Sequence, residues 1–212
     1  VTDRVVFQMT NETALIEWFD EYFPADTFIL LRHPIPNAMS IMTRKWRHEC
    51  GDFLNHRRFV ETHLTAKQVD LARRVVQDGS ALAKHVLDWS LKMLVPVRAI
   101  ESGRHSNWLV MTYEQAVLEP DRVVEIIAKR LDFSDTNAMR EQIQRPSRTV
   151  AADTTDRVDD PNYLITRWRR NIDHREEEQL MRIPAAFGIE VYTPGRDVAA
   201  DQYLHGMPAP AP

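Results

Sequence analysis

An arginine and a serine stand eight residues apart, at Arg32 and Ser40, with Pro34 between them. The planar guanidinium of an arginine offers paired N–H donors to a phosphate, and a serine hydroxyl adds a neutral donor. The spacing therefore predicts a clamp for one phosphate group. An arginine that ends a strand in solvent, followed by an ordinary helical serine, is the alternative interpretation.

Two elements must position this pair. Thr27 to Leu31 form a continuous apolar run, which is typical of a strand buried on both faces of a parallel sheet. Pro34 forces the chain out of that strand, and a helix predicted from about Pro36 to Arg47 returns Ser40 to the same edge. Open α/β sheets bind their ligands at the carboxyl ends of the strands, and Arg32 falls there.

The rest of the chain alternates between short apolar runs and amphipathic segments. We predict further strands at 5–7 and 109–112, and helices at 11–22, 65–94 with a break at Gly79-Ser80, 120–131 and 173–187. Residues 48–64 and 145–162 are polar and predict loops. The aromatic residues of the first helix, Trp18, Phe19, Tyr22 and Phe23, are expected in the core.

This pattern predicts one α/β domain over residues 1–206, with a parallel sheet flanked by helices and a disordered tail at 207–212. The chain has 212 residues, a hydrophobic share of 43% and no apolar run long enough to span a membrane. Its net charge of -4 disfavours nucleic acid as a partner. The single cysteine, Cys50, excludes an internal disulfide and favours a reducing compartment, so we expect a cytoplasmic protein.

Metal-ligand patterns are absent from the sequence. His48, Cys50 and His56 stand close together, but their spacing matches neither a Cys-x-x-Cys nor a His-Glu-x-x-His arrangement, so we predict no metal site. The basic residues that follow Ser40, beginning with Arg44, are expected to attract an anionic nucleotide or to line the entrance for a second substrate.

Three segments in order are similar to motifs of the sulfotransferases that use 3′-phosphoadenosine 5′-phosphosulfate (PAPS). Residues 28–40 match a strand, Arg, a variable residue, Pro and a Ser eight positions after the Arg, with His33 at the variable position. Residues 109–120 match a strand, Tyr-Glu and a helix-opening Pro, although Gln115 replaces the usual Asp. Residues 167–192 match a closing Trp-Arg pair, an acidic helix, Phe-Gly and a Tyr.

The resemblance implies roles for individual residues. Arg32 and Ser40 would bind the 3′-phosphate of the nucleotide, Tyr113 would line the adenosine pocket, and Glu114 would brace the loop around it. Arg148, favoured over Arg145, would come from a late basic loop that closes on the 3′-phosphate. Glu12 is the candidate general base, and its alternative interpretation is a first-turn glutamate favoured by the helix dipole.

The family's P-loop nucleoside-kinase-like sheet also carries a glycine-rich loop with a Lys or Arg that holds the 5′-phosphosulfate, and this sequence contains no such loop. We therefore expect either an N-terminally incomplete chain, which the abrupt start favours, or a member without transferase activity. An incomplete sheet would leave apolar faces uncovered.

The implied function is transfer of a sulfuryl group from PAPS to a hydroxyl or amine of a small-molecule or carbohydrate acceptor, without a metal. The alternatives are a non-catalytic nucleotide-binding protein and another P-loop-like phosphotransferase, such as a kinase.

Overall fold

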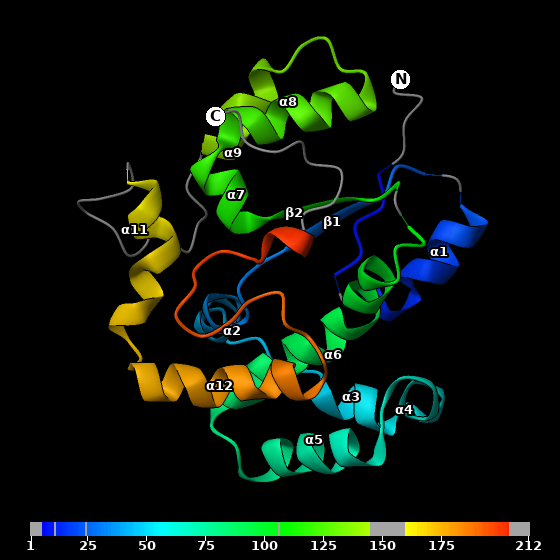
Figure 1. The fold of residues 1–212 in the computed structure, drawn as a ribbon, viewed down its shortest axis with the longest axis vertical. Coiled ribbons are helices and arrows are strands. Elements are labelled where there is room, and N and C mark those ends of the chain that lie inside the picture. Colours follow the sequence, from blue (N-terminus) through cyan, green and yellow to red (C-terminus); the bar gives the residue numbers. More distant parts are fainter. Residues whose placement is uncertain (1–5, 11, 24, 106, 145–159, 204–212) are drawn as a thin grey trace.

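The predicted parallel sheet is present as two strands, β1 (Phe28–Leu31) and β2 (Leu109–Thr112). They belong to a computed structural model that describes residues 6–10, 12–23, 25–105, 107–144 and 160–203 (Figure 1). Phe28 pairs with Leu109 and Leu31 with Thr112, so both strands run in the same direction and end at the same edge. The described part of the chain is mixed α/β and mostly helical.

Helices make up most of the remaining structure. Their bounds are α1 Ile16–Tyr22, α2 Pro34–Thr43, α3 Cys50–Asn55, α4 Arg57–His63, α5 Ala66–Asp78, α6 Ala81–Glu101, α7 Tyr113–Leu118, α8 Pro120–Leu131, α9 Asn137–Gln144, α11 Pro161–Thr166 and α12 His174–Ala186. Short 3₁₀ segments occupy η1 Thr13–Leu15, η2 Arg167–Arg170 and η3 Asp201–Tyr203. None of the helices in this described part combines the length and the apolar character that a membrane crossing requires.

The long helix α6 is the centre of the packing. Helices α2 and α12 lie against it, and α7, α8 and α9 gather on the other side of the two strands (Figure 1). The buried side chains of Ile29, Leu31 and Val110 join the core around α6, whereas Leu109 and Met111 pack with Val123 of α8 in a second, smaller core. The sheet therefore separates two apolar layers, and its strand ends are held from both sides.

A proline inside α6 explains how the N-terminal segment attaches to it. Pro96 has no N–H, so the carbonyl of Lys92, four residues earlier, lacks its usual partner within the helix. The hydroxyl of Thr13 in η1 donates to that carbonyl oxygen at 2.6 Å. A buried carbonyl without a partner is costly, so this contact fixes η1 on α6.

The predicted helix boundaries are confirmed where local chemistry sets them. Thr65 caps α5 in a reciprocal pair with Gln68, and Ser80 accepts from the backbone N–H of Ala83 at 3.1 Å to open α6 after the predicted break. Asp173 caps α12, and the chain leaves that helix through Gly188 at a φ of 77°. A positive φ is the conformation that glycine adopts without steric cost.

The segment 48–64 corrects the prediction of a loop, because it forms α3 and α4. Cys50 is fully buried there, and its thiol donates to the carbonyl of Lys84 in α6. Phe59 is buried as well. The polar, histidine-rich composition concealed these two apolar anchors, around which the short helices pack.

The N-terminal region brings three further corrections. Val6 and Phe7 lie in irregular chain with exposed fractions of 91% and 62%, so the expected strand at 5–7 is absent from its described part. Trp18 and Tyr22 on α1 are more than half exposed, contrary to their expected place in the core. Leu30 of β1 is also 61% exposed, which contradicts burial of that strand on both faces. Apolar side chains thus remain uncovered beside β1 and along α1.

Candidate functional site

Arg32 and Tyr113 meet at the carboxyl ends of the two strands. Arg32 follows β1 directly and Tyr113 follows β2, so the parallel register brings them to the same edge of the sheet. The guanidinium carbon of Arg32 lies 4.3 Å from the centroid of the Tyr113 ring, which is the geometry of a cation–π contact. Two residues that the sequence predicted for one site, 81 positions apart, are therefore in contact.

The Arg32 guanidinium is held in a half-buried position between groups of both charge signs. Burial lowers the pKa of Arg32, and the nearby charge of Arg167 acts in the same direction. The neighbouring Tyr113 and Glu114 side chains act in the opposite direction. The Nε–H of Arg32 is buried and has no hydrogen-bond partner among the described residues. A buried cationic donor without an acceptor is suited to an anionic ligand.

Glu114, which follows β2, links the carboxyl ends of the two strands through hydrogen bonds. Its side chain is only 2% exposed. The backbone N–H of His33 donates to Oε1 at 3.0 Å, and the Tyr192 hydroxyl donates to Oε2 at 2.8 Å. Burial raises the pKa of Glu114, and burial with the adjacent Glu114 charge raises that of Tyr192 well above its ordinary value. These contacts agree with the bracing role that the resemblance implies for Glu114.

His33 is a neutral cap on helix α2. It is 1% exposed, and its Nδ1 accepts the backbone N–H of Ile35 at 3.3 Å. Burial, with the charges of Arg169 and Arg32, lowers its pKa to about 3. Because Nδ1 is the acceptor, the ring proton sits on Nε2, which is buried and lacks a partner within the described structure.

The first turn of α2 supplies no free backbone amide to a ligand. Residues 34 and 36 are prolines without an N–H, Ile35 donates to His33 Nδ1, and Asn37 donates to the His33 carbonyl at 3.1 Å. The usual affinity of a helix N-terminus for anions is therefore absent here. Any anion at this edge must be held by side chains.

Trp168 and Arg169 close the site from the C-terminal part of the chain. The His33 ring contacts the rings of both Trp168 and Tyr192, at centroid distances of 4.8 and 5.0 Å. Arg169 stacks on Trp168 at 4.4 Å and donates to Glu177 at 2.6 Å and to Asp197 at 2.7 Å. This network fixes η2 on α12 and so holds Trp168 against His33.

The sequence predicted three further site residues, which are Ser40, Glu12 and Arg148. Ser40 lies in α2 with a half-buried side chain, and its convergence with Arg32 remains a prediction. Glu12 lies before η1 with an exposed side chain, and the first helix begins with η1 rather than at Glu12. Arg148 lies outside the described residues.

The sequence did not identify His33 as a site residue, and it placed Trp168 and Tyr192 only within a motif. One signal was available for His33: it occupies the variable position between Arg32 and Pro34, immediately after a buried strand. Its burial depends on contacts with residues more than 130 positions away, which local patterns do not report.

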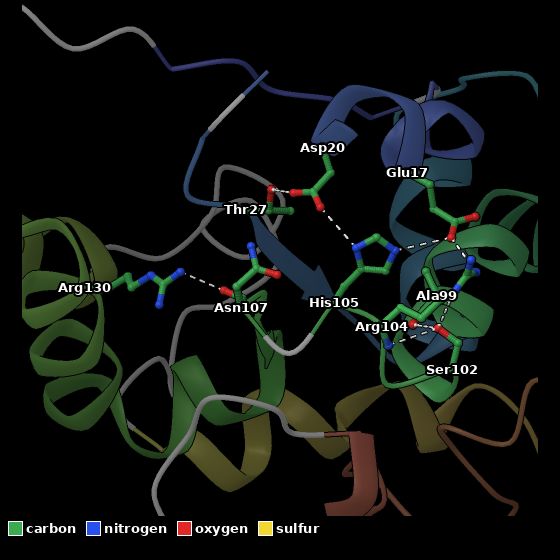
Figure 2. Close-up of polar contacts among 9 residues, drawn as sticks. All are labelled: Glu17, Asp20, Thr27, Ala99, Ser102, Arg104, His105, Asn107 and Arg130. Atoms are coloured by element: carbon green, nitrogen blue, oxygen red, sulfur yellow. Dashed lines mark hydrogen bonds and ion pairs between the residues drawn. The ribbon is translucent and has the colours of Figure 1, made fainter. Parts of the chain in front are cut away.

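The opposite end of the strands also carries charged groups, but they pair with one another (Figure 2). His105 places Nδ1 at 3.1 Å from Asp20 and Nε2 at 3.3 Å from Glu17, both on α1. The Thr27 hydroxyl donates to Asp20 at 3.0 Å, and Arg104 donates to Glu17 at 2.9 Å. These contacts clamp α1 to the chain between α6 and β2.

Comparison with known proteins does not assign the site. No model of a known protein family, no curated protein and no solved structure matches the chain. Within the described ranges, no group of three or more His, Cys, Asp or Glu residues is arranged to hold a metal ion. The geometry of the site itself is therefore the basis for a functional proposal.

Proposed function

We propose that this chain is a PAPS-dependent sulfotransferase, or the greater part of one, and that the edge formed by Arg32 and Tyr113 binds the 3′-phosphoadenosine portion of the nucleotide. The observation that carries the proposal is the contact of the Arg32 guanidinium with the Tyr113 ring at 4.3 Å. Arg32 comes from the first family-like motif and Tyr113 from the second, and the fold joins them at the ligand-binding edge of a parallel sheet.

Each residue has a chemical task in this proposal. Arg32 contributes the cation for the 3′-phosphate, and Ser40 a hydroxyl donor. Tyr113 presents an aromatic surface beside the adenosine. Glu114 keeps both strand ends in place through His33 and Tyr192. The acceptor is a hydroxyl or amine on a small molecule or carbohydrate, and the proposed location is cytoplasmic.

In the proposed reaction the acceptor oxygen or nitrogen forms a bond to sulfur while the bond from sulfur to the 5′-phosphate oxygen breaks. The acceptor's proton passes to a base, for which Glu12 is the sequence candidate, and 3′-phosphoadenosine 5′-phosphate leaves. Transfer of this kind depends on in-line positioning and on cations near the leaving oxygen. The residues described here hold the 3′ end of the nucleotide only.

A second candidate function is nucleotide binding without transfer. Two observations favour it: the sequence contains no glycine-rich loop with a Lys or Arg before a helix, and Glu12 is exposed. A binding protein would keep the Arg32–Tyr113 contact and lose the transfer chemistry.

The choice of nucleotide tests the proposal. Calorimetry with the 212-residue chain should show that 3′-phosphoadenosine 5′-phosphate binds at least about tenfold more tightly than ATP, because ATP lacks a 3′-phosphate for Arg32. Transfer of labelled sulfate from PAPS to any of a panel of hydroxyl and amine acceptors would then favour the enzyme over the binding protein. Equal affinity for the two nucleotides, or no binding of either nucleotide, would contradict the proposed function.

A further inference from the structure

Several buried N–H groups near the Arg32 edge have no acceptor. They are His33 Nε2, Trp168 Nε1, Arg32 Nε and Arg169 Nη2, each without a hydrogen-bond partner in the part of the chain that the structure describes. His33 and Trp168 are 1% and 4% exposed, so bulk water does not reach them. Buried polar groups in folded proteins are nearly always paired, and a set of unpaired ones requires an explanation.

All members of this set are donors. The guanidinium and indole nitrogens carry hydrogen and accept nothing, and the ring proton of neutral His33 sits on Nε2 because Nδ1 accepts from Ile35. The acceptors of the region are already engaged: Glu114 by His33 and Tyr192, and Glu177 by Arg169 and Gly195. The missing partner is therefore a group rich in acceptor oxygens.

The side chains that carry these donors are also neighbours. The rings of His33 and Trp168 are 4.8 Å apart and tilted by only 31°, and Arg169 covers the Trp168 ring. Arg32 is next to His33 in the chain, and the charges of Arg32 and Arg169 both act on the His33 ring. Neutral donors beside the Arg32 guanidinium are suited to a tetrahedral oxyanion rather than to a neutral ligand.

We propose that His33 Nε2–H and Trp168 Nε1–H both donate to the phosphate group that Arg32 attracts, so that a histidine and a tryptophan, with no backbone amide of α2, complete the anion site. This inference rests on the proposed function and deepens it, because it names the donors that recognise the 3′-phosphate.

The indole signals of the protein provide the test. The chain has five tryptophans, each with one indole N–H resonance in a ¹H–¹⁵N spectrum, and Trp168→Phe identifies the Trp168 signal by its loss. On titration with 3′-phosphoadenosine 5′-phosphate, and separately with inorganic phosphate, the Trp168 signal should shift downfield more than the other four. In calorimetry Trp168→Phe should weaken nucleotide binding about tenfold, the effect of one hydrogen bond to a charged group.

Trp108→Phe is the matched control. The Trp108 indole is also buried with an unpaired Nε1–H, but its ring stacks on His105 at 4.1 Å, in the cluster at the other end of the strands. This variant should bind the nucleotide within about twofold of the unmodified chain, because it removes the same group from outside the site.

The possible outcomes separate the two proposals. If the nucleotide binds and the Trp168 signal stays in place, the inference is wrong and the nucleotide site stands. If inorganic phosphate shifts the Trp168 signal but the nucleotide shows no binding, the inference stands and the proposed function is wrong. Absence of any binding overturns both. Triple-resonance assignment of the unmodified chain also identifies the Trp168 signal, so its shift can be read without a folded variant.

Discussion

Both ends of the β1–β2 pair carry histidine, arginine and tryptophan side chains. Within the part of the chain that the structure describes, most of their polar groups are paired at the amino end of the strands, and several are unpaired at the carboxyl end. At the amino end, His105, Asp20 and Glu17 satisfy one another, and Arg130 donates to the Asn107 carbonyl at 2.8 Å (Figure 2). Arg130 also donates to Asp26 at 2.7 Å. At the carboxyl end, donors of His33, Trp168 and Arg32 have no partner among the described residues. The indole of Trp108 is the exception at the amino end.

This difference indicates how each end is used. Charged groups that pair with one another hold elements in place, and here they fix α1 beside the strands. Unpaired buried donors cost stability and persist where another requirement maintains them, of which ligand binding is the most direct. We therefore interpret the amino end as a structural clamp and the carboxyl end as a binding site.

The largest expected effect is on stability at the carboxyl end. Glu114→Ala leaves the His33 N–H and the Tyr192 hydroxyl buried without an acceptor, so the free energy of unfolding should fall by about 3–5 kcal/mol. Urea unfolding measures this change. Glu17→Ala, which removes a partly exposed carboxylate of the amino end, should cost at most about 1 kcal/mol. Equal costs would contradict the contrast between the two ends.

A smaller effect should appear in the pH dependence of stability. The pKa of His33 is about 3 in the folded chain and 6.5 as its ordinary value, so the unfolded chain binds a proton below pH 6.5 that the folded chain does not. Stability is therefore lost as pH falls, by about 2 kcal/mol between pH 7 and 5 for this group.

His33→Asn removes this titration while keeping a side-chain oxygen that can cap α2. Its unfolding free energy should consequently fall less steeply than that of the unmodified chain between pH 7 and 5, in denaturant titrations at each pH. His63 and His85, whose pKa values are also lowered, are present in both proteins and cancel in the comparison. Parallel pH profiles would show that His33 is not buried in the neutral form.

The smallest effect belongs to the amino end. Asp20→Ala removes the acceptor of the Thr27 hydroxyl and one partner of His105, and it should lower the free energy of unfolding by about 1 kcal/mol. Nucleotide affinity measured by calorimetry should stay within about twofold. A large loss of affinity in a folded Asp20→Ala variant would show that the two ends are coupled.

Local chemistry allowed much of the fold to be predicted. The apolar run before Arg32, the capping pair of Thr65 and Gln68, and Gly188 after α12 each act within a few residues, and each element is present. Arg32 and Tyr113 were predicted for one site because both lie in family-like motifs, and the parallel pairing of the strands that precede them explains their contact.

What could not be predicted depends on distant contacts. The burial of Glu114 requires His33, 81 residues away, and Tyr192, 78 residues away. The apolar face of α1 is visible in the sequence, but the exposure of Trp18 and Tyr22 depends on whether another element covers that face. The hydrophobic pattern of a sequence shows which side chains lie on one apolar face of a helix, but it does not show which element covers that face.

A matched pair of arginines tests the central claim most directly. Arg32 follows β1 and has an unpaired buried Nε at the carboxyl end of the strands, whereas Arg130 on α8 is paired with Asp26 at the amino end. Calorimetric titration of 3′-phosphoadenosine 5′-phosphate into Arg32→Ala should show affinity reduced by about 1.5–3 kcal/mol, and Arg130→Ala should bind like the unmodified chain. Equal affinities for the two variants would contradict the assignment of the binding site to the carboxyl end.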